Sequence, residues 1–260
     1  MLHTDIPQAA PPVYLGIAGW AIRREHVGRF STTGTHLQRY AGRFNAVEIN
    51  SCFYRPHRLS TYERWAASVP DDFRFAVKLP KVVTHEARLV GATDAVERFL
   101  AETSGLGTKR GPILVQLPPS FAHDQKVAES FFGDLRSRYD GEVAFEPRHE
   151  TWFTGAVNSM LQHYRVARVA ADPARVSEAA EPAGYDGLVY YRLHGSPRIY
   201  YSAYTAEFLK DVAHSIAQQM AGTRRVWCIF DNTALGAATS DGLTVKSLLM
   251  ESASLQTREG

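Results

Sequence analysis

Charged side chains end two short apolar runs of this chain, where a buried β-strand would not normally carry them. One run ends with Glu146 and Arg148, separated by a proline, and another ends with Arg192 and His194, separated by a leucine. Because side chains alternate along a strand, the two members of each pair would share one face. A carboxylate beside a guanidinium or an imidazole can hold an anionic group or move a proton.

Other apolar runs of the chain also end with polar residues. In parallel α/β folds the carboxyl ends of the strands meet at one edge, and the binding site lies there. Uncompensated charges cost on the order of several kcal/mol each to bury, so such a cluster predicts a functional site. For any one residue, the alternative is a structural ion pair. The further strand-end residues are Glu48, Asn50, Lys78, Gln116, Asp172, Asp231 and Asn232.

Eight runs rich in β-branched and aromatic residues recur along the chain, and most precede apolar residues at helical spacing. Several are apolar on both faces, as in a buried parallel sheet. The expected strands are residues 14–20, 46–50, 74–80, 112–118, 143–148, 166–172, 188–194 and 225–232. Eight βα units predict an α/β fold, a (β/α)8 TIM-type barrel. An open doubly wound sheet is the alternative.

The barrel is expected to form a single domain over residues 13–256, after a flexible N-terminal segment 1–12. The stretch 173–185 is rich in Ala, Pro and Gly, which predicts that the sixth helix is degenerate. Ser60 and Glu63 fit a capping box at the start of a helix that ends before Pro70.

Composition limits the class of partner. The chain has 260 residues, of which 45% are hydrophobic, and a formal net charge of +2, which argues against nucleic acid as a partner. Two cysteines do not make a disulfide framework, and neither a signal peptide nor a run of about 18 apolar residues is found. We therefore expect a cytoplasmic, soluble protein with no membrane partner, and make no prediction of its oligomeric state.

Five segments resemble the YecE-like family, catalogued as domain of unknown function 72, and they occur in the family's order. They are residues 47–55 (VEINSCFYR), 73–78 (FRFAVK), 111–121 (GPILVQLPPSF), 146–149 (EPRH) with Trp152, and 191–195 (YRLHG). The resemblance runs from residue 16 to about residue 249 and implies a TIM-type barrel but no settled activity. Where the family often ends its last strand with paired asparagines, this chain has Asp231 and Asn232, which adds a possible acid.

One hypothesis is metal-dependent chemistry, as in a sugar isomerase-like or phosphodiesterase-like enzyme. Four acids beside three permanent bases leave a formal charge of about −1, too balanced to concentrate several divalent ions, and no His-x-His spacing is present. We therefore predict no cofactor and keep a divalent metal as a minor alternative. The candidate ligands would be Glu48, Glu146, Asp172, His194 and Asp231.

A second hypothesis is a lysine that forms a Schiff base with the substrate, because Lys78 lies near the end of a barrel strand, where such lysines can lie. Nearby Glu48 or Glu146 would hold its amine charged, which favours electrostatic binding instead. A third hypothesis is a non-catalytic module that binds sugar or nucleic acid. Its stacking surfaces would be Trp20, Tyr54, Trp152 and the Tyr200–Tyr201 pair.

The favoured hypothesis uses acids and bases together, in an enzyme that acts on a small phosphorylated or carboxylated sugar-like metabolite. Whether it is an isomerase, a lyase or a hydrolase is left open. Glu146→Gln is expected to abolish turnover and leave the fold intact. The expected catalytic residues are Glu146, His194, Lys78 and Asp172. The expected ligand contacts are Arg148, Arg192, Glu48, Asn50, Gln116, Asp231, Asn232, Trp20 and Tyr54.

Overall fold

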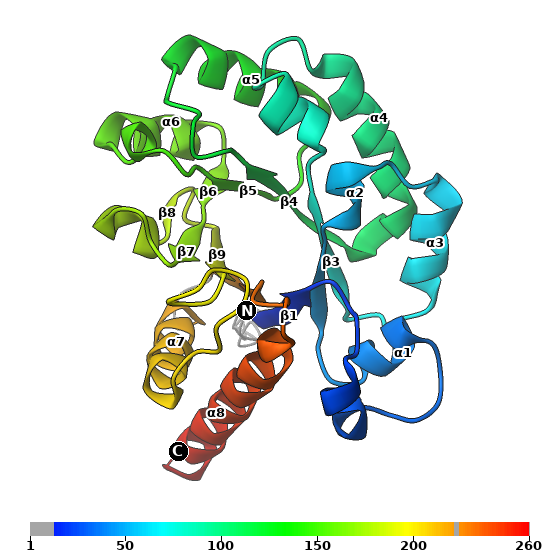
Figure 1. Cartoon of the computed structure of the whole chain (residues 1–260). Helices are drawn as coiled ribbons and strands as arrows, with labels where there is room; N and C mark the ends of the chain where they lie inside the picture. Colours follow the sequence, from blue (N-terminus) through cyan, green and yellow to red (C-terminus); the bar gives the residue numbers. More distant parts are fainter. Residues whose placement is uncertain (1–12, 221–223, 260) are drawn as a thin grey trace, which may run out of the picture.

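The strands form one inner sheet, and the helices lie around its outside (Figure 1). The computed structural model describes residues 13–220 and 224–259, so the segment 1–12, expected to be flexible, lies outside the described residues. The strands are β1 Val13–Ala18, β2 Ala46–Ile49, β3 Arg74–Lys78, β4 Arg110–Gln116, β5 Val143–Glu146, β6 Val166–Arg168, β7 Ala170–Asp172, β8 Ala183–Gly184, β9 Leu188–Leu193 and β10 Arg225–Phe230.

The described sheet has ten strands rather than the eight expected, in the order β7-β9-β10-β1-β2-β3-β4-β5-β6-β8. The expected strand 166–172 is divided at Val169 into β6, which pairs with β5, and β7, which pairs with β9. Because one residue joins β6 to β7, the chain itself links the two ends of the parallel sheet. The other additional strand is β8, whose two residues pair antiparallel with β6. The α/β barrel is therefore confirmed, with two more strands than expected.

The helices cover the outer face of the sheet. The α-helices are α1 His36–Ala41, α2 Ser51–Tyr54, α3 Leu59–Ala67, α4 Thr93–Thr103, α5 Gln125–Arg138, α6 Gly155–His163, α7 Ala206–Met220 and α8 Ala237–Glu259. Short 3-10 helices are η1 Arg24–Arg29, η3 Ser104–Lys109, η4 Glu150–Trp152 and η5 Ser177–Ala180, and η2 Val82–Glu86 is a π-helix. The degenerate sixth helix is confirmed, since only η5 and β8 occupy the stretch 173–185.

The capping box expected at Ser60 is wrong. Helix α3 begins one residue earlier, at Leu59, so Ser60 lies inside the first turn and the N-cap is Arg58, without a side-chain cap. A capping box is found instead at Thr35 and Gln38, at the start of α1.

The barrel interior is packed in layers, which is typical of small closed sheets. Its lower layer is apolar: Tyr190 and Trp227 stack at 6.0 Å, and Gly111 leaves room for the Trp227 ring. This layer includes Tyr14, Ala46, Ala76, Leu114, Ala144, Tyr190 and Trp227. Two residues further along their strands, the same inner face carries Glu48, Lys78, Gln116, Glu146 and Arg192. Period-2 alternation therefore places the charged layer directly above the apolar one.

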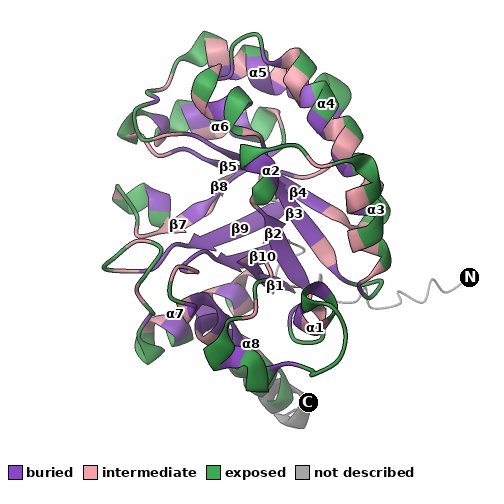
Figure 2. Ribbon diagram, turned by 45° about the vertical axis from the view of Figure 1, so that its right-hand side comes forward, coloured by how far each residue is buried: buried purple, intermediate pink, exposed green. Residues whose placement is uncertain are grey.

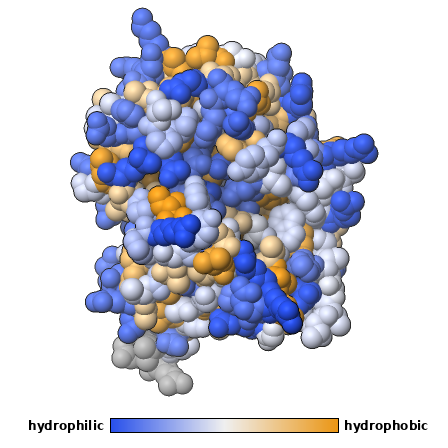
Figure 3. Space-filling model, in the orientation of Figure 1, coloured by the Kyte–Doolittle hydropathy of each residue, from blue (hydrophilic) through white to orange (hydrophobic). Residues whose placement is uncertain are grey.

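Burial follows the same plan, with buried strands inside and helices whose outer faces are exposed (Figure 2). Over the face seen in Figure 3, hydrophilic residues dominate and hydrophobic residues form small separate groups. Among residues 13–220 and 224–259, no helix has both the length and the apolar character needed to cross a bilayer.

Candidate functional site at the carboxyl end of the barrel

Arg192 lies at the centre of the charged layer and is 1% exposed. Its Nη2 lies 2.8 Å from Glu48 Oε1 and 2.9 Å from Asp231 Oδ2, and its Nη1 lies 3.0 Å from Glu146 Oε2. Burial lowers the pKa of Arg192, but the three carboxylates outweigh this effect and raise the pKa well above its usual value. The guanidinium is therefore charged at every ordinary pH and holds the three acids together.

His194 bridges two of these acids. Its Nε2 is 3.0 Å from Glu146 Oε1, and its Nδ1 is 3.1 Å from Asp231 Oδ2. Burial lowers the pKa of His194, but the charge of Glu146 and the hydrogen bonds with both carboxylates outweigh burial and raise the pKa. An imidazolium would donate a hydrogen bond from each ring nitrogen, and this geometry offers an acceptor to each.

Glu146 joins this pair to the next strand. Burial raises the pKa of its carboxyl, yet the charges of His194 and Arg192 outweigh burial and hold the pKa well below its usual range. Gln116 Nε2 donates to Glu146 Oε1 at 2.9 Å, and Lys78 Nζ donates to Gln116 Oε1 at 2.6 Å. A chain of hydrogen bonds therefore runs from Lys78 to His194.

The surroundings of Lys78 differ from those expected. Its Nζ lies 4.2 Å from the centre of the Phe53 ring, and the residue is 9% exposed. Burial, with Arg192 second, lowers the pKa of Lys78 to about 8, although Glu48 and Glu146 act in the opposite direction. Glu48 and Glu146 act in the expected direction, but burial and the charge of Arg192 outweigh them, so the Lys78 amine loses its proton more readily than that of an ordinary lysine.

We expect Lys78→Met to stabilise the protein by roughly 2 kcal/mol at pH 7, since a pKa unit corresponds to about 1.4 kcal/mol and a lost hydrogen bond offsets part of the gain. A folded-state pKa below the usual 10.5 means that the charged amine opposes folding, fully below about pH 8. The gain should shrink as the pH rises toward 10.5. Urea unfolding at pH 7 and pH 10 measures this, with the exposed Lys81→Met as the control. A loss of stability at pH 7 would contradict it.

Arg148 lies at the rim of the mouth, beyond the end of β5. Its side chain is 17% exposed, and its Nε lies 3.9 Å from Glu146 Oε1, a looser contact than those of Arg192. Arg148 therefore has donors to offer at the edge of the charged layer, whereas Arg192 is committed to the acids within it.

His85 is a residue of this mouth that sequence reasoning missed. It lies in the π-helix η2, half-buried, with its ring edge-on to Phe53 at 5.0 Å. Burial, Lys78, Lys81 and Arg148 lower the pKa of His85, so its imidazole is neutral at neutral pH. A single π-helical turn often marks a functional site, but no pattern in the sequence predicted this π-helix.

Other predicted contacts lie apart from this cluster. Asp172 pairs in register with Leu193, which packs toward the helices, so Asp172 faces away from the barrel axis. Asn232 is fully buried and donates to Asp241 Oδ2 at 2.7 Å and to the Ser202 carbonyl, which ties the end of β10 to α8. The structure therefore does not bring these two side chains to the others.

The last three predicted contacts surround the mouth at different depths. Because β2 ends at Ile49, Asn50 is the N-cap of α2 rather than a strand residue sharing a face with Glu48. Its Oδ1 is buried and has no hydrogen-bond partner among the described residues. Trp20 is half-buried, 5.0 Å edge-on from Trp65. Tyr54 is 79% exposed.

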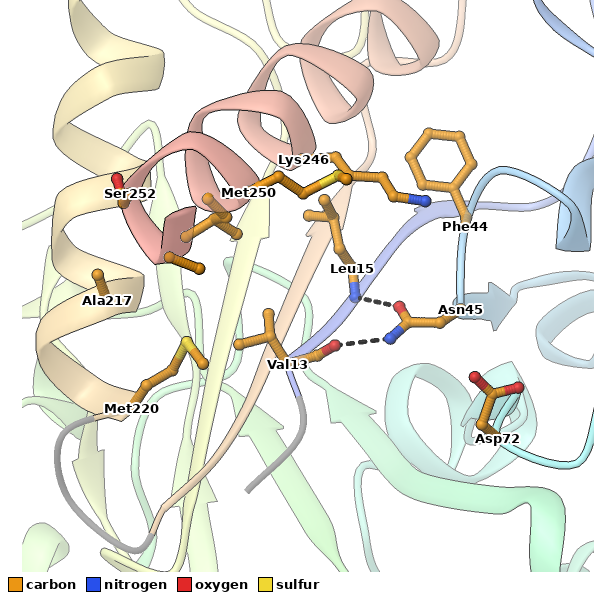
Figure 4. Close-up of a pocket in the computed structure, with 12 residues that line it drawn as sticks. Val13, Leu15, Phe44, Asn45, Asp72, Ala217, Met220, Lys246, Met250 and Ser252 are labelled. Carbon is orange, nitrogen blue, oxygen red and sulfur yellow. Dashed lines mark hydrogen bonds between the residues drawn. The ribbon is translucent and has the colours of Figure 1, made fainter. Parts of the chain in front are cut away.

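The charged layer opens into a cavity of about 110 Å³, lined among others by Glu146, Arg148 and His194. The cavity of about 700 Å³ in Figure 4 is larger, but it lies at the opposite end of the barrel, between α7, α8 and the start of β1. Apolar side chains line most of it, and Asn45 there bonds the β1 backbone. We place the candidate site at the smaller cavity, because acids and bases converge there.

Metal-ligand geometry is a separate question. Within residues 13–220 and 224–259, no group of three or more His, Cys, Asp or Glu side chains is arranged to hold a metal ion. The carboxylates of Glu48, Glu146 and Asp231 converge on the Arg192 guanidinium instead.

The fold and this mouth define a TIM-type α/β barrel with a charged carboxyl-end site. A family model described as "Protein of unknown function DUF72" matches residues 14–259, and the chain belongs to this family. The resemblance noted in the sequence is confirmed.

Two curated relatives support the assignment. The chain is 32% identical to the UPF0759 protein YecE of Escherichia coli K12 over 176 residues, which cover 65% of this chain and 62% of YecE. The match therefore spans less than two thirds of that protein's length. The UPF0759 protein YunF of Bacillus subtilis is 22% identical over 266 residues, covering 91% of this chain and 94% of YunF.

Two solved structures share the fold. A DUF72 family protein of Enterococcus faecalis superposes with a TM-score of 0.79 at 19% identity, covering 92% of this chain and 95% of that one. A DUF72 family protein of Thermotoga maritima gives 0.77 at 23% identity, covering 92% and 99%.

Proposed function

We propose that this chain is an enzyme that acts on a small anionic, phosphorylated or carboxylated sugar-like metabolite by acid–base chemistry at the barrel mouth. One observation carries the proposal: the hydrogen-bonded pair of Glu146 and His194 lines the same cavity as the loosely held Arg148. A proton donor and an anion-binding group then face one small space.

Anion recognition is assigned to Arg148 rather than to Arg192. Arg192 already faces three carboxylates, so a ligand would have to displace one of them. Arg148 keeps donors at the rim, and Lys78 adds positive charge below its pKa of about 8. Arg192 in this scheme positions the acids, while Arg148 orients the ligand.

Proton transfer is assigned to His194. Its raised pKa favours the protonated ring, which suits a general acid. Glu146 stays ionised beside it and stabilises the imidazolium while the proton leaves and returns. Neutral His85, whose pKa the charge of Arg148 helps to lower, supplies a second group able to accept a proton. This arrangement serves isomerase, lyase and hydrolase chemistry alike.

The proposal is tested by thermal shift of the purified full chain against sugar phosphates, sugar acids and inorganic phosphate. We expect Arg148→Ala to weaken binding of the best anion at least about tenfold, the size expected for a charge-assisted contact. Arg165→Ala, which removes an exposed arginine paired with Asp140 at the other end of the barrel, is the matched control. Equal binding by both variants and the parent would refute the assignment.

A chelator separates this scheme from the metal-dependent alternative. Turnover of a ligand found in that screen should survive dialysis against EDTA, because side chains of the chain carry the proton transfers. Loss of turnover with EDTA, restored by Mg²⁺ or Mn²⁺, would favour the metal-dependent alternative.

A further inference from the structure

The amine of Lys78 differs from those of Lys81 and Lys109 in what surrounds it. Lys81 Nζ lies 3.3 Å from Glu86 Oε1, and Lys109 Nζ lies 3.4 Å from Asp71 Oδ1. In the described part of the chain, Lys78 forms no ion pair within 4.0 Å, and its Nζ donates a hydrogen bond to the neutral amide of Gln116. The amine is thus fixed in place without a negative partner.

Gln116 also sets the direction of the amine. Its Nε2 is fixed by donation to Glu146 Oε1 at 2.9 Å, so its Oε1 must point away from Glu146, toward Lys78. Phe53 contacts Nζ through its ring and limits the access of water. A glutamate at position 116 would be of similar size but would bring a carboxylate beside Nζ.

Burial and the charge of Arg192 act on this amine together. They lower the pKa of Lys78 to about 8, so that roughly a tenth of the molecules carry a neutral amine at pH 7. An ordinary lysine is neutral in less than about one molecule in a thousand at that pH. A neutral amine is the form that attacks a carbonyl carbon.

We propose that Lys78 is a nucleophile that forms a Schiff base with a small carbonyl acid whose anionic group is held at Arg148. This inference rests on the proposed function and names its substrate class: keto acids, or aldehydes bearing a carboxylate or phosphate. Nζ bonds to the carbonyl carbon, and its two hydrogens leave with the carbonyl oxygen as water. His194 lends a proton to the departing hydroxyl and regains one released from Nζ.

Reductive trapping tests the inference on the full chain. The protein is incubated with pyruvate, and separately with glyoxylate, in the presence of cyanoborohydride at pH 7.5, and the modified lysines are quantified by peptide mass spectrometry. We expect Lys78 to be labelled at least about tenfold faster than the ion-paired Lys81 and Lys109, given its neutral fraction. Labelling of Lys78 no faster than of those two lysines, with both probes, would overturn the inference.

Gln116→Glu is the sharper variant. The added carboxylate should hold Nζ protonated, lower labelling of Lys78 at pH 7.5 about tenfold, and move its onset to higher pH. Gln116→Met removes the bond without adding charge and should retain an onset near pH 8. Identical pH profiles in Gln116→Glu and the parent would count against Lys78 as the nucleophile.

The two proposals fail in different ways. If an anion binds and Arg148→Ala abolishes its binding while Lys78 stays unlabelled, the Schiff base is wrong and the proposed function stands. If labelling of Lys78 occurs equally in the parent and in Arg148→Ala, the nucleophile stands and the assignment of Arg148 is wrong.

Discussion

Replacing Arg192 with methionine is expected to destabilise the protein by about 3–5 kcal/mol at pH 7, the cost of breaking a buried ion network on one side. Glu48, Glu146 and Asp231 would then repel one another in a layer where the guanidinium is 1% exposed. The variant could fold only if some of these carboxylates took up protons or if water entered the layer.

Urea unfolding followed by circular dichroism measures this loss, and Arg148→Met serves as the matched control. Arg148 contacts Glu146 at 3.9 Å from a partly exposed position, so its removal should cost less than about 1 kcal/mol. The penalty of Arg192→Met should shrink as the pH falls below about 4.5, where the unpaired acids can take protons. A variant within about 1 kcal/mol of the parent at pH 7 would show that the carboxylates do not depend on Arg192.

Glu146→Gln is expected to lower the pKa of His194 by at least about one unit, because it removes the charge that does most to raise it. It should also cost about 2–4 kcal/mol of stability at neutral pH, by loss of a buried charged partner. This revises the expectation that the variant leaves the fold intact, since Glu146 pairs with both Arg192 and His194.

The contributions of Glu146 and His194 to folding stability change with pH in opposite directions. The pKa of Glu146 is depressed in the folded state, so its contribution is present above its usual pKa of 4.5 and is lost as the pH falls below it. The pKa of His194 is raised, so its contribution is present below 6.5 and is lost as the pH rises through its folded-state pKa.

Titration of the imidazole signals by NMR, with unfolding curves at pH 3, pH 5 and pH 8, measures both effects. Glu142→Gln, at the start of β5 and far from the mouth, is the control and should leave the His194 titration unchanged. An unaltered His194 pKa in Glu146→Gln would mean that the hydrogen bond between the two side chains does not govern the protonation of the ring.

The sequence correctly predicted the features that depend only on local backbone geometry. Strand alternation correctly placed Glu48, Glu146 and Arg192 on one inner face, because a strand that stays in register has no other choice. The same rule failed for Asn50, because β2 ends before it and the backbone turns into α2.

What the sequence could not provide was the partner of each charge. Arg192 was expected to hold a ligand, but three acids from β2, β5 and the end of β10 surround it, and that convergence depends on distances across the barrel. For the same reason the sequence could not show that burial and Arg192 lower the pKa of Lys78, and His85 was overlooked because a π-helical turn has no sequence signature.

The most direct test of the central claim is a crystal structure of the protein soaked with a mixture of sugar phosphates and keto acids. The proposal predicts density in the cavity lined by Glu146, Arg148 and His194, with the anionic group within hydrogen-bond distance of the Arg148 guanidinium. Anion density among Arg110, Arg136, Arg165 and Arg225, which line a cavity at the opposite end of the barrel, together with an empty mouth, would contradict it.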